Sequence, residues 1–327
     1  MDALWSWLVA QDAAVPQWLT LQPDAARALQ DELSARWNTV LPDVESVESM
    51  LVAGTPRVSC QLITPHGAEA GCILFLHGGG WAFGNLTTHQ RFMRLLAIAT
   101  GRRVLAPDYR LAPEHPFPAP FEDCRAAWRW LAADSAFQGP LAIAGDSAGA
   151  NLAMAVMLDA IKAGARTPDL ALLFYGVFSN DLDSPSYRRF ADGFGLTQAG
   201  MTRFWDYYVP NPAARADPLV AAVHASDDLL NRLPPVYLNA AGLDPLLCDT
   251  LDFAKRLNEA GVTHELVVHE GVHHGFMQMS LRLTEAQRAI DLAAAFLINR
   301  TASDKPEPEH PAISSLPGPN VSFSELP

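Results

Sequence analysis

The chain has 327 residues, of which 49% are hydrophobic and 18% are charged. A chain of this length and composition buries most of its unfolded surface, which excludes disorder over most of its length. Its formal net charge of −13 repels phosphate groups, so the composition argues against nucleic acid and anionic membranes as partners.

Residues 1 to about 50 are predicted to be helical, because apolar side chains recur there at helical spacing. From residue 58 onward, short apolar segments typical of strands alternate with amphipathic helical patterns. The expected strands are 58–64, 72–77, 102–109, 140–146, 169–176, 235–242 and 264–270, and the expected helices are 87–100, 119–133, 148–163, 247–260 and 285–299. This alternation predicts the α/β class, with a mostly parallel sheet covered by helices on both faces.

Two segments depart from the alternation. Residues 178–222 form an insertion rich in Asp, Ser, Pro and aromatic residues, with a helical pattern over 196–209. Residues 301–327 are proline-rich and lack periodicity, so we expect a solvated tail.

Targeting and membrane signals are weak. Asp2 stands where a secretory signal needs positive charge, and Asp12 interrupts the N-terminal apolar stretch. No segment is apolar enough to predict a membrane span. The cysteines are isolated, without a C-x-x-C pair, which predicts reduced thiols and a cytoplasmic location.

The strongest local motif is Gly-Asp-Ser-Ala-Gly at 145–149, between a predicted strand and a predicted helix. A nucleophile at Ser147 would stand on a sharp turn, and the flanking glycines leave room for it. The N–H of Ala148, at the start of the helix, points to the same space and can stabilise an oxyanion. A small-residue turn that only packs closely is the alternative, but the flanking strand and helix favour the nucleophile.

A second motif, His-Gly-Gly-Gly-Trp at 77–81, directly follows a buried strand. Three consecutive glycines are costly in regular structure, but they suit a loop whose backbone N–H groups approach a ligand. The alternative is a flexible glycine-rich loop. Its position upstream of the 145–149 motif favours a second source of oxyanion donors.

Five segments in this order resemble the α/β-hydrolases of the bacterial hormone-sensitive-lipase type, the family IV carboxylesterases. They are HGGGWAFG (77–84), DYRLAPEHPFPAP (108–120), GDSAG (145–149), GLDPLLCD (242–249) and HHGF (273–276). The resemblance implies an α/β-hydrolase fold with N-terminal cap helices in 1–50 and a catalytic domain over 51–300. It also implies that 178–222 is a cap insertion, and it does not extend into 301–327.

The resemblance implies a catalytic triad of Ser147, Asp244 and His274, in the chain order of α/β-hydrolases. Asp244 precedes Pro-Leu and His274 stands in His-Gly-Phe, as in the family. Ser147 would attack the carbonyl carbon, His274 would transfer the proton, and Asp244 would fix the imidazole tautomer. The N–H groups expected to hold the oxyanion are those of Gly79, Gly80 and Ala148.

Several neighbours are rival candidates. His269 and His273 lie close to the expected base and are interpreted as structural. Asp249 falls inside the following helix and should face away from the strand end. The side chain of Asp146 should diverge from the nucleophile on the turn, which leaves it a supporting hydrogen-bonding role. The segment 108–120 is expected to support the oxyanion loop.

The cap is expected to cover the strand ends and to form a closed apolar pocket, with Trp81, Phe204 and Trp205 as contacts. Such a pocket suits a small-molecule ester with a short acyl chain. The dinucleotide, P-loop and zinc-ligand fingerprints are absent from the sequence, so neither a cofactor nor a metal is expected.

Three functions are therefore considered. The first is a carboxylesterase acting on short-chain acyl esters. The second is a deacetylase of a specific small molecule, or an amidase, with the same triad. The third is a non-catalytic ligand-binding homologue, which should lack the nucleophile or the base, whereas Ser147 and His274 are both present. The oligomeric state is left open, with a homodimer as one alternative.

Overall fold

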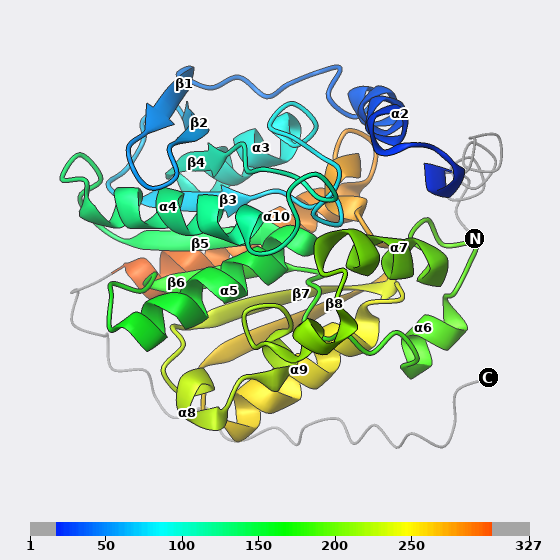
Figure 1. The fold of residues 1–327 in the computed structure, drawn as a ribbon. Helices are drawn as coiled ribbons and strands as arrows, with labels where there is room; N and C mark the ends of the chain where they lie inside the picture. Colours follow the sequence, from blue (N-terminus) through cyan, green and yellow to red (C-terminus); the bar gives the residue numbers. More distant parts are fainter. Residues whose placement is uncertain (1–17, 303–327) are drawn as a thin grey trace, which may run out of the picture.

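The computed structural model describes residues 18–302. Its centre is an eight-stranded sheet in the order β1-β2-β4-β3-β5-β6-β7-β8 (Figure 1). The strands are β1 (Ser46–Val52), β2 (Val58–Thr64), β3 (Cys72–Leu76), β4 (Arg103–Pro107), β5 (Leu141–Asp146), β6 (Leu170–Phe174), β7 (Val236–Leu243) and β8 (His264–His273). β2 runs antiparallel to both of its neighbours, β1 and β4. The remaining neighbours in the sheet, from β4 through β3, β5, β6 and β7 to β8, are parallel. The predicted α/β class and mostly parallel sheet are confirmed.

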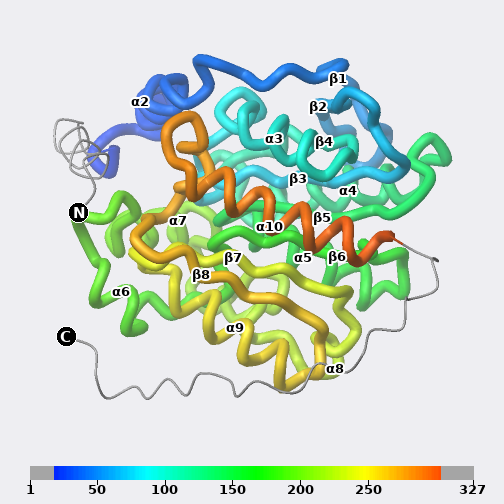
Figure 2. Tube along the Cα trace, turned by 180° about the vertical axis from the view of Figure 1, so that it is seen from behind, coloured from blue at the N-terminus to red at the C-terminus, as the bar shows by residue number. Residues whose placement is uncertain are grey.

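Helices cover both faces of the sheet, which explains why its central strands are apolar along their whole length. In β3, Leu74 and Leu76 pack into one buried cluster, while Ile73 and Phe75 pack into the other. Figure 1 views the face covered by α4 (Ala119–Ala133), α5 (Ala148–Ala163) and α9 (Leu247–Glu259), and Figure 2 views the opposite face, covered by α3 (Gln90–Thr100) and α10 (Thr284–Thr301).

The remaining elements lie beyond the ends of the sheet or in its connections. They are η1 (Trp18–Thr20), α2 (Pro23–Ala35), α6 (Pro185–Arg189), α7 (Gln198–Tyr208), η2 (Pro212–Ala216), η3 (Ala222–His224), α8 (Asp227–Leu230) and η4 (Phe276–Met279). The rings of Trp18 and Phe204 stack with their centroids 4.8 Å apart. This contact joins the N-terminal segment to α7 of the insertion.

The expectation that residues 1 to about 50 are helical is wrong for the last part of that range. Within the described residues the long helix ends at Ala35, and 46–52 forms the edge strand β1. Its register with β2 is continuous from the Ser46–Thr64 pair to the Val52–Val58 pair. Pairing with a neighbouring strand determines the conformation of this segment, and local apolar spacing does not reveal such pairing.

The predictions for residues 1–17 and 303–327 lie outside the described residues. Within 18–302, no helix combines the length and the apolar composition that crossing a bilayer requires.

Candidate active site

Ser147 occupies the turn between β5 and α5. Its backbone has φ 54° and ψ −120°, a conformation that is unfavourable for any residue other than glycine. The strand and helix on either side hold the residue there. A Cβ at Gly149 would lie 2.0 Å from the carbonyl oxygen of Leu76, so only glycine lets α5 approach β3 this closely. The two elements together present the hydroxyl at the end of the sheet.

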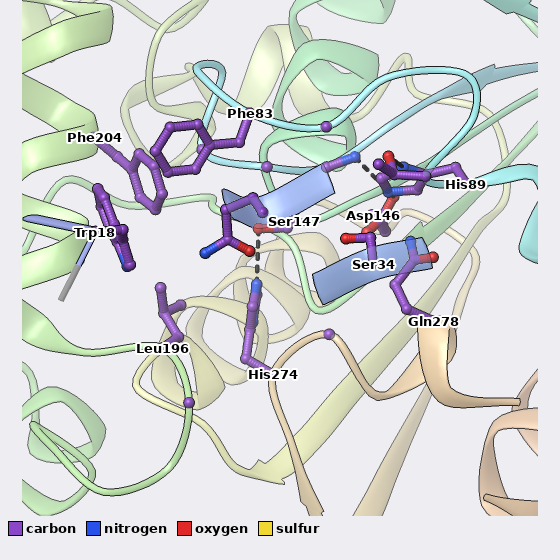
Figure 3. Close-up of a pocket in the computed structure, with 18 of the residues that line it drawn as sticks. Trp18, Ser34, Phe83, His89, Asp146, Ser147, Leu196, Phe204, His274 and Gln278 are labelled. Atoms are coloured by element: carbon purple, nitrogen blue, oxygen red, sulfur yellow. Dashed lines mark hydrogen bonds and ion pairs between the residues drawn. The ribbon is translucent and has the colours of Figure 1, made fainter. Parts of the chain in front are cut away.

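The structure brings Ser147, His274 and Asp244 together from three separate connections. The Oγ of Ser147 lies 2.8 Å from Nε2 of His274 (Figure 3), and Nδ1 of His274 lies 2.7 Å from Oδ2 of Asp244. Asp244 is fully buried, and its Oδ1 accepts a hydrogen bond from the N–H of Leu246. A carboxylate that accepts from Nδ1 leaves Nε2 free to accept from the serine hydroxyl.

The loop after β3 places two glycine N–H groups beside the serine. Gly79 and Gly80 line the same cavity as Ser147, and within residues 18–302 their N–H groups donate no hydrogen bond. Gly80 has φ 59°, and a Cβ there would lie 2.3 Å from the ring of Phe204. Ala148 is the first residue of α5, so its N–H has no partner within the helix. Three backbone donors are thus available near one hydroxyl.

The carboxylate of Asp146 holds this loop against the turn at Ser147. Its Oδ1 accepts from the N–H of Gly78 at 2.9 Å and lies 3.3 Å from Nε2 of His89. Burial opposes ionisation, but the charge and hydrogen bond of His89, together with the Gly78 N–H, hold the pKa of Asp146 below its usual value. The Nδ1 of His89 is engaged in turn by the hydroxyl of Thr88 at 2.9 Å. The Asp146–His89 contact therefore fixes the start of this loop.

The rival residues have other partners. The Oδ2 of Asp249 accepts from the N–H groups of Phe178 and Ser179, and burial raises its pKa well above the usual value. The Nδ1 of His269 lies 2.5 Å from Oε1 of Glu285. Neither side chain takes part in the Ser147–His274–Asp244 arrangement.

His273 gives a pH-dependent prediction. Burial lowers its pKa to about 4, against an ordinary value of 6.5. Between these pH values, His273 binds more protons in the unfolded chain than in the folded chain. The free energy of unfolding therefore decreases as pH falls, by up to about 3 kcal/mol. We expect His273→Asn, whose amide can replace the Nδ1 contact to the His274 carbonyl, to weaken this dependence. Urea unfolding at pH 7 and pH 4.5 measures it, and an equal loss in both proteins would contradict the prediction.

Arg27 of α2 was not predicted from the sequence, yet it ties α2 to the site. Its guanidinium donates to the carbonyl oxygens of Ala82 and Ala112, each at 2.8 Å, and also pairs with Glu114. It thereby joins α2 to the glycine-rich loop after β3 and to the segment 108–120.

A cavity of about 270 Å³ lies over Ser147 and His274. Its residues come from the strand ends, α2, α7 and η4. They include Trp18, Gln30, Asp31, Ser34, Phe83, Thr88, His89, Leu196, Met201, Phe204 and Gln278. The expectation of an apolar pocket is therefore only half right, because polar side chains form one part of the wall.

Of the three expected aromatic contacts, Phe204 lines the cavity. The expectation for Trp81 and Trp205 is wrong, because both side chains are fully buried beneath it. Trp81 stacks on Tyr208 with centroids 4.2 Å apart and donates from Nε1 to Asn151. Residue type alone suggested a pocket contact, whereas packing between α5 and α7 makes these rings part of the core.

A mostly parallel sheet with a serine after β5, an acid after β7 and a histidine after β8 defines the α/β-hydrolase class. The family model for the alpha/beta hydrolase fold matches residues 73–278, more than half of the chain. The chain belongs to this family, and its resemblance to the hormone-sensitive-lipase type is confirmed.

Characterised relatives carry esterase names. The chain is 34% identical to carboxylesterase NlhH of Mycobacterium tuberculosis, over 69% of this chain and 72% of that protein. It is also 34% identical to an ethyl acetate hydrolase of Pseudomonas putida, over 67% of this chain and 70% of that protein.

Solved structures agree with the fold. A thermostable esterase from Pseudomonas putida superposes with a TM-score of 0.85 at 29% identity, covering 91% of this chain and 96% of that one. An alpha/beta hydrolase from the metagenome of Lake Arreo gives 0.84 at 33% identity, covering 92% and 97%.

Proposed function

We propose that the protein is a serine carboxylesterase that hydrolyses short-chain acyl esters through an acyl-enzyme intermediate. The observation that carries this proposal is the continuous contact from Ser147 Oγ through the His274 imidazole to the Asp244 carboxylate, at 2.8 and 2.7 Å. The names of the relatives support ester bonds as the target.

In the proposed reaction, the Ser147 oxygen attacks the ester carbonyl carbon while Nε2 of His274 takes its proton. The carbonyl oxygen becomes an anion held by the backbone N–H groups of Gly79, Gly80 and Ala148, and each such donor typically contributes about 3–4 kcal/mol. The tetrahedral adduct then expels the alcohol, which receives the proton from His274. Water then attacks the acyl-enzyme carbonyl carbon while His274 takes its proton. The second adduct releases the acid as the Ser147 oxygen leaves and recovers the proton from His274.

The cavity limits the size of the acyl group. Its volume of about 270 Å³ is below the roughly 300–1,000 Å³ of pockets for drug-sized ligands. The aromatic group of Trp18, Phe83 and Phe204, whose ring centroids lie 4.8 to 5.3 Å apart, closes one end. This space suits a short acyl chain better than a long one.

A series of nitrophenyl esters and one nitroanilide tests the proposal. We expect kcat/KM for the acetyl and butyryl esters to exceed that for the octanoyl ester at least about tenfold, with slower anilide cleavage. An anilide rate above the ester rate would favour the amidase alternative. Binding of the esters without any turnover would favour the non-catalytic alternative.

The cytoplasmic location belongs to the same proposal. All four cysteines are free thiols in the structure, and three of them are buried. Burial raises the pKa of Cys60 and of Cys72 to about 12, so these thiols stay protonated and unreactive. Such cysteines suit a reducing compartment.

A further inference from the structure

The cavity has two chemically different sides with Ser147 between them (Figure 3). Trp18, Phe83, Leu196 and Phe204 lie on one side, which we call the apolar half. Ser34, His89 and Gln278 lie on the other side, called the polar half. Thr88, bonded to His89, and Asp31, one turn before Ser34 on α2, belong to the same half. An ester bound at Ser147 must therefore direct one of its two parts toward hydrogen-bonding side chains.

Some of these polar groups are already paired and others are not. Both nitrogens of His89 are engaged, by Thr88 and by Asp146. In contrast, Nε2 of Gln278 is buried and has no hydrogen-bond partner among the described residues. Ser34 is half-buried and faces the same space, and its hydroxyl makes no hydrogen bond within 18–302. An unpartnered buried amide nitrogen such as that of Gln278 is costly, and a hydroxyl of the substrate would remove this cost.

The polar half is also held in place before any ligand arrives. Asn38, just beyond α2, donates to the carbonyl of Thr88 at 3.0 Å and accepts from the N–H of Arg91 at 2.9 Å. Asp31 accepts from the Asn85 side chain at 3.0 Å. With α2 fixed to the loop in this way, the hydroxyl of Ser34 is positioned without further ordering cost.

The charges of the cavity narrow the ligand chemistry. Among the described residues that line it, none is Lys or Arg, whereas Asp31 and Asp146 carry carboxylates. An anionic group would be repelled by these carboxylates, and the side chain of His89 is already paired with Asp146. Uncharged hydroxyl groups suit the free amide and hydroxyl best.

We propose that the polar half binds the alcohol part of the ester, and that this alcohol is uncharged and carries further hydroxyl groups. The inference rests on the proposed esterase function. The apolar half, closed by stacked aromatic rings, suits the acyl chain. Asp31 is exposed, so the polar half reaches solvent on the side from which the first product, the alcohol, can leave.

Two esters with the same acyl group test this inference. Glycerol 1-acetate and propyl acetate have alcohols of equal carbon number that differ in hydroxyl groups alone. We compare kcat/KM for the two esters in the full-length protein, in Gln278→Leu and in Ser34→Ala. Each variant removes about one hydrogen bond to the alcohol, so the ratio of glycerol to propyl ester should fall about fivefold to tenfold. Because it is a ratio, general effects on the nearby His274 cancel.

Gln138→Leu is the matched control, since Gln138 is exposed in the loop before β5 and lies outside the cavity. Its ratio should equal that of the unmodified protein. An unchanged ratio in both Gln278→Leu and Ser34→Ala would overturn the inference. The inference would also be overturned if the two variants lost kcat/KM on propyl glycolate alone, because this ester carries its hydroxyl on the acyl part. If the unmodified protein hydrolyses none of these esters, the esterase proposal itself fails.

Discussion

Replacing Ser147 with alanine is expected to reduce kcat on nitrophenyl acetate by roughly 10⁵-fold or more, because the attacking oxygen is lost. The residual rate would come from the N–H groups of Gly79, Gly80 and Ala148, which still stabilise an oxyanion formed by water attack. Alanine removes one hydroxyl from a largely buried site and creates no clash. The far-UV circular dichroism and the melting temperature should therefore stay close to those of the unmodified protein.

Ser135→Ala is the control for this measurement, because Ser135 is exposed in the connection between α4 and β5. It should keep full activity. A Ser147→Ala protein that retains a tenth of the activity would show that another group is the nucleophile.

Asp244→Asn should give the second largest effect, a loss of kcat of roughly 10⁴-fold. The Oδ2 of Asp244 accepts from Nδ1 of His274 at 2.7 Å. An amide that presents its NH₂ group there would favour the wrong tautomer and would not stabilise the imidazolium. The KM should change much less than kcat, because Asp244 is fully buried and does not line the cavity.

Asp249→Asn provides the matched comparison, because it removes a second buried carboxyl group only five positions along the chain. Burial raises the pKa of Asp249 well above its usual value, so loss of its charge should cost less than loss of the charge of Asp244. An asparagine oxygen can still accept from the N–H groups of Phe178 and Ser179. Activity should stay within a few-fold of normal. A larger loss of kcat in Asp249→Asn than in Asp244→Asn would show that Asp249, and not Asp244, supports the histidine.

The sequence predicts the elements that local chemistry determines. The turn at Ser147 needs glycines at fixed positions, and the alternation of strands and helices follows from burial of the sheet on both faces. For this reason the α/β class and the positions of the central strands agree with the structure. The edge strand β1 was not predicted, because the spacing of its apolar residues does not indicate that it pairs with β2.

The cavity wall was less predictable, because it depends on contacts between distant segments. Trp81 neighbours the oxyanion loop in sequence, yet its ring packs against Tyr208 of α7 in the core. Gln278 lies four positions beyond His274, in η4, and Ser34 belongs to a helix without any motif. That these two side chains share one side of a cavity follows from the docking of α2, through Arg27 and Asn38, which no local pattern reveals.

Covalent trapping tests the central claim most directly. The protein is incubated with a small nitrophenyl alkylphosphonate, digested and analysed by mass spectrometry. We expect one phosphonyl group per chain, on the peptide that contains Ser147, with release of nitrophenol and loss of esterase activity in the same proportion. A label on any other residue, or full inactivation without a label on Ser147, would contradict the assignment of this hydroxyl as the nucleophile.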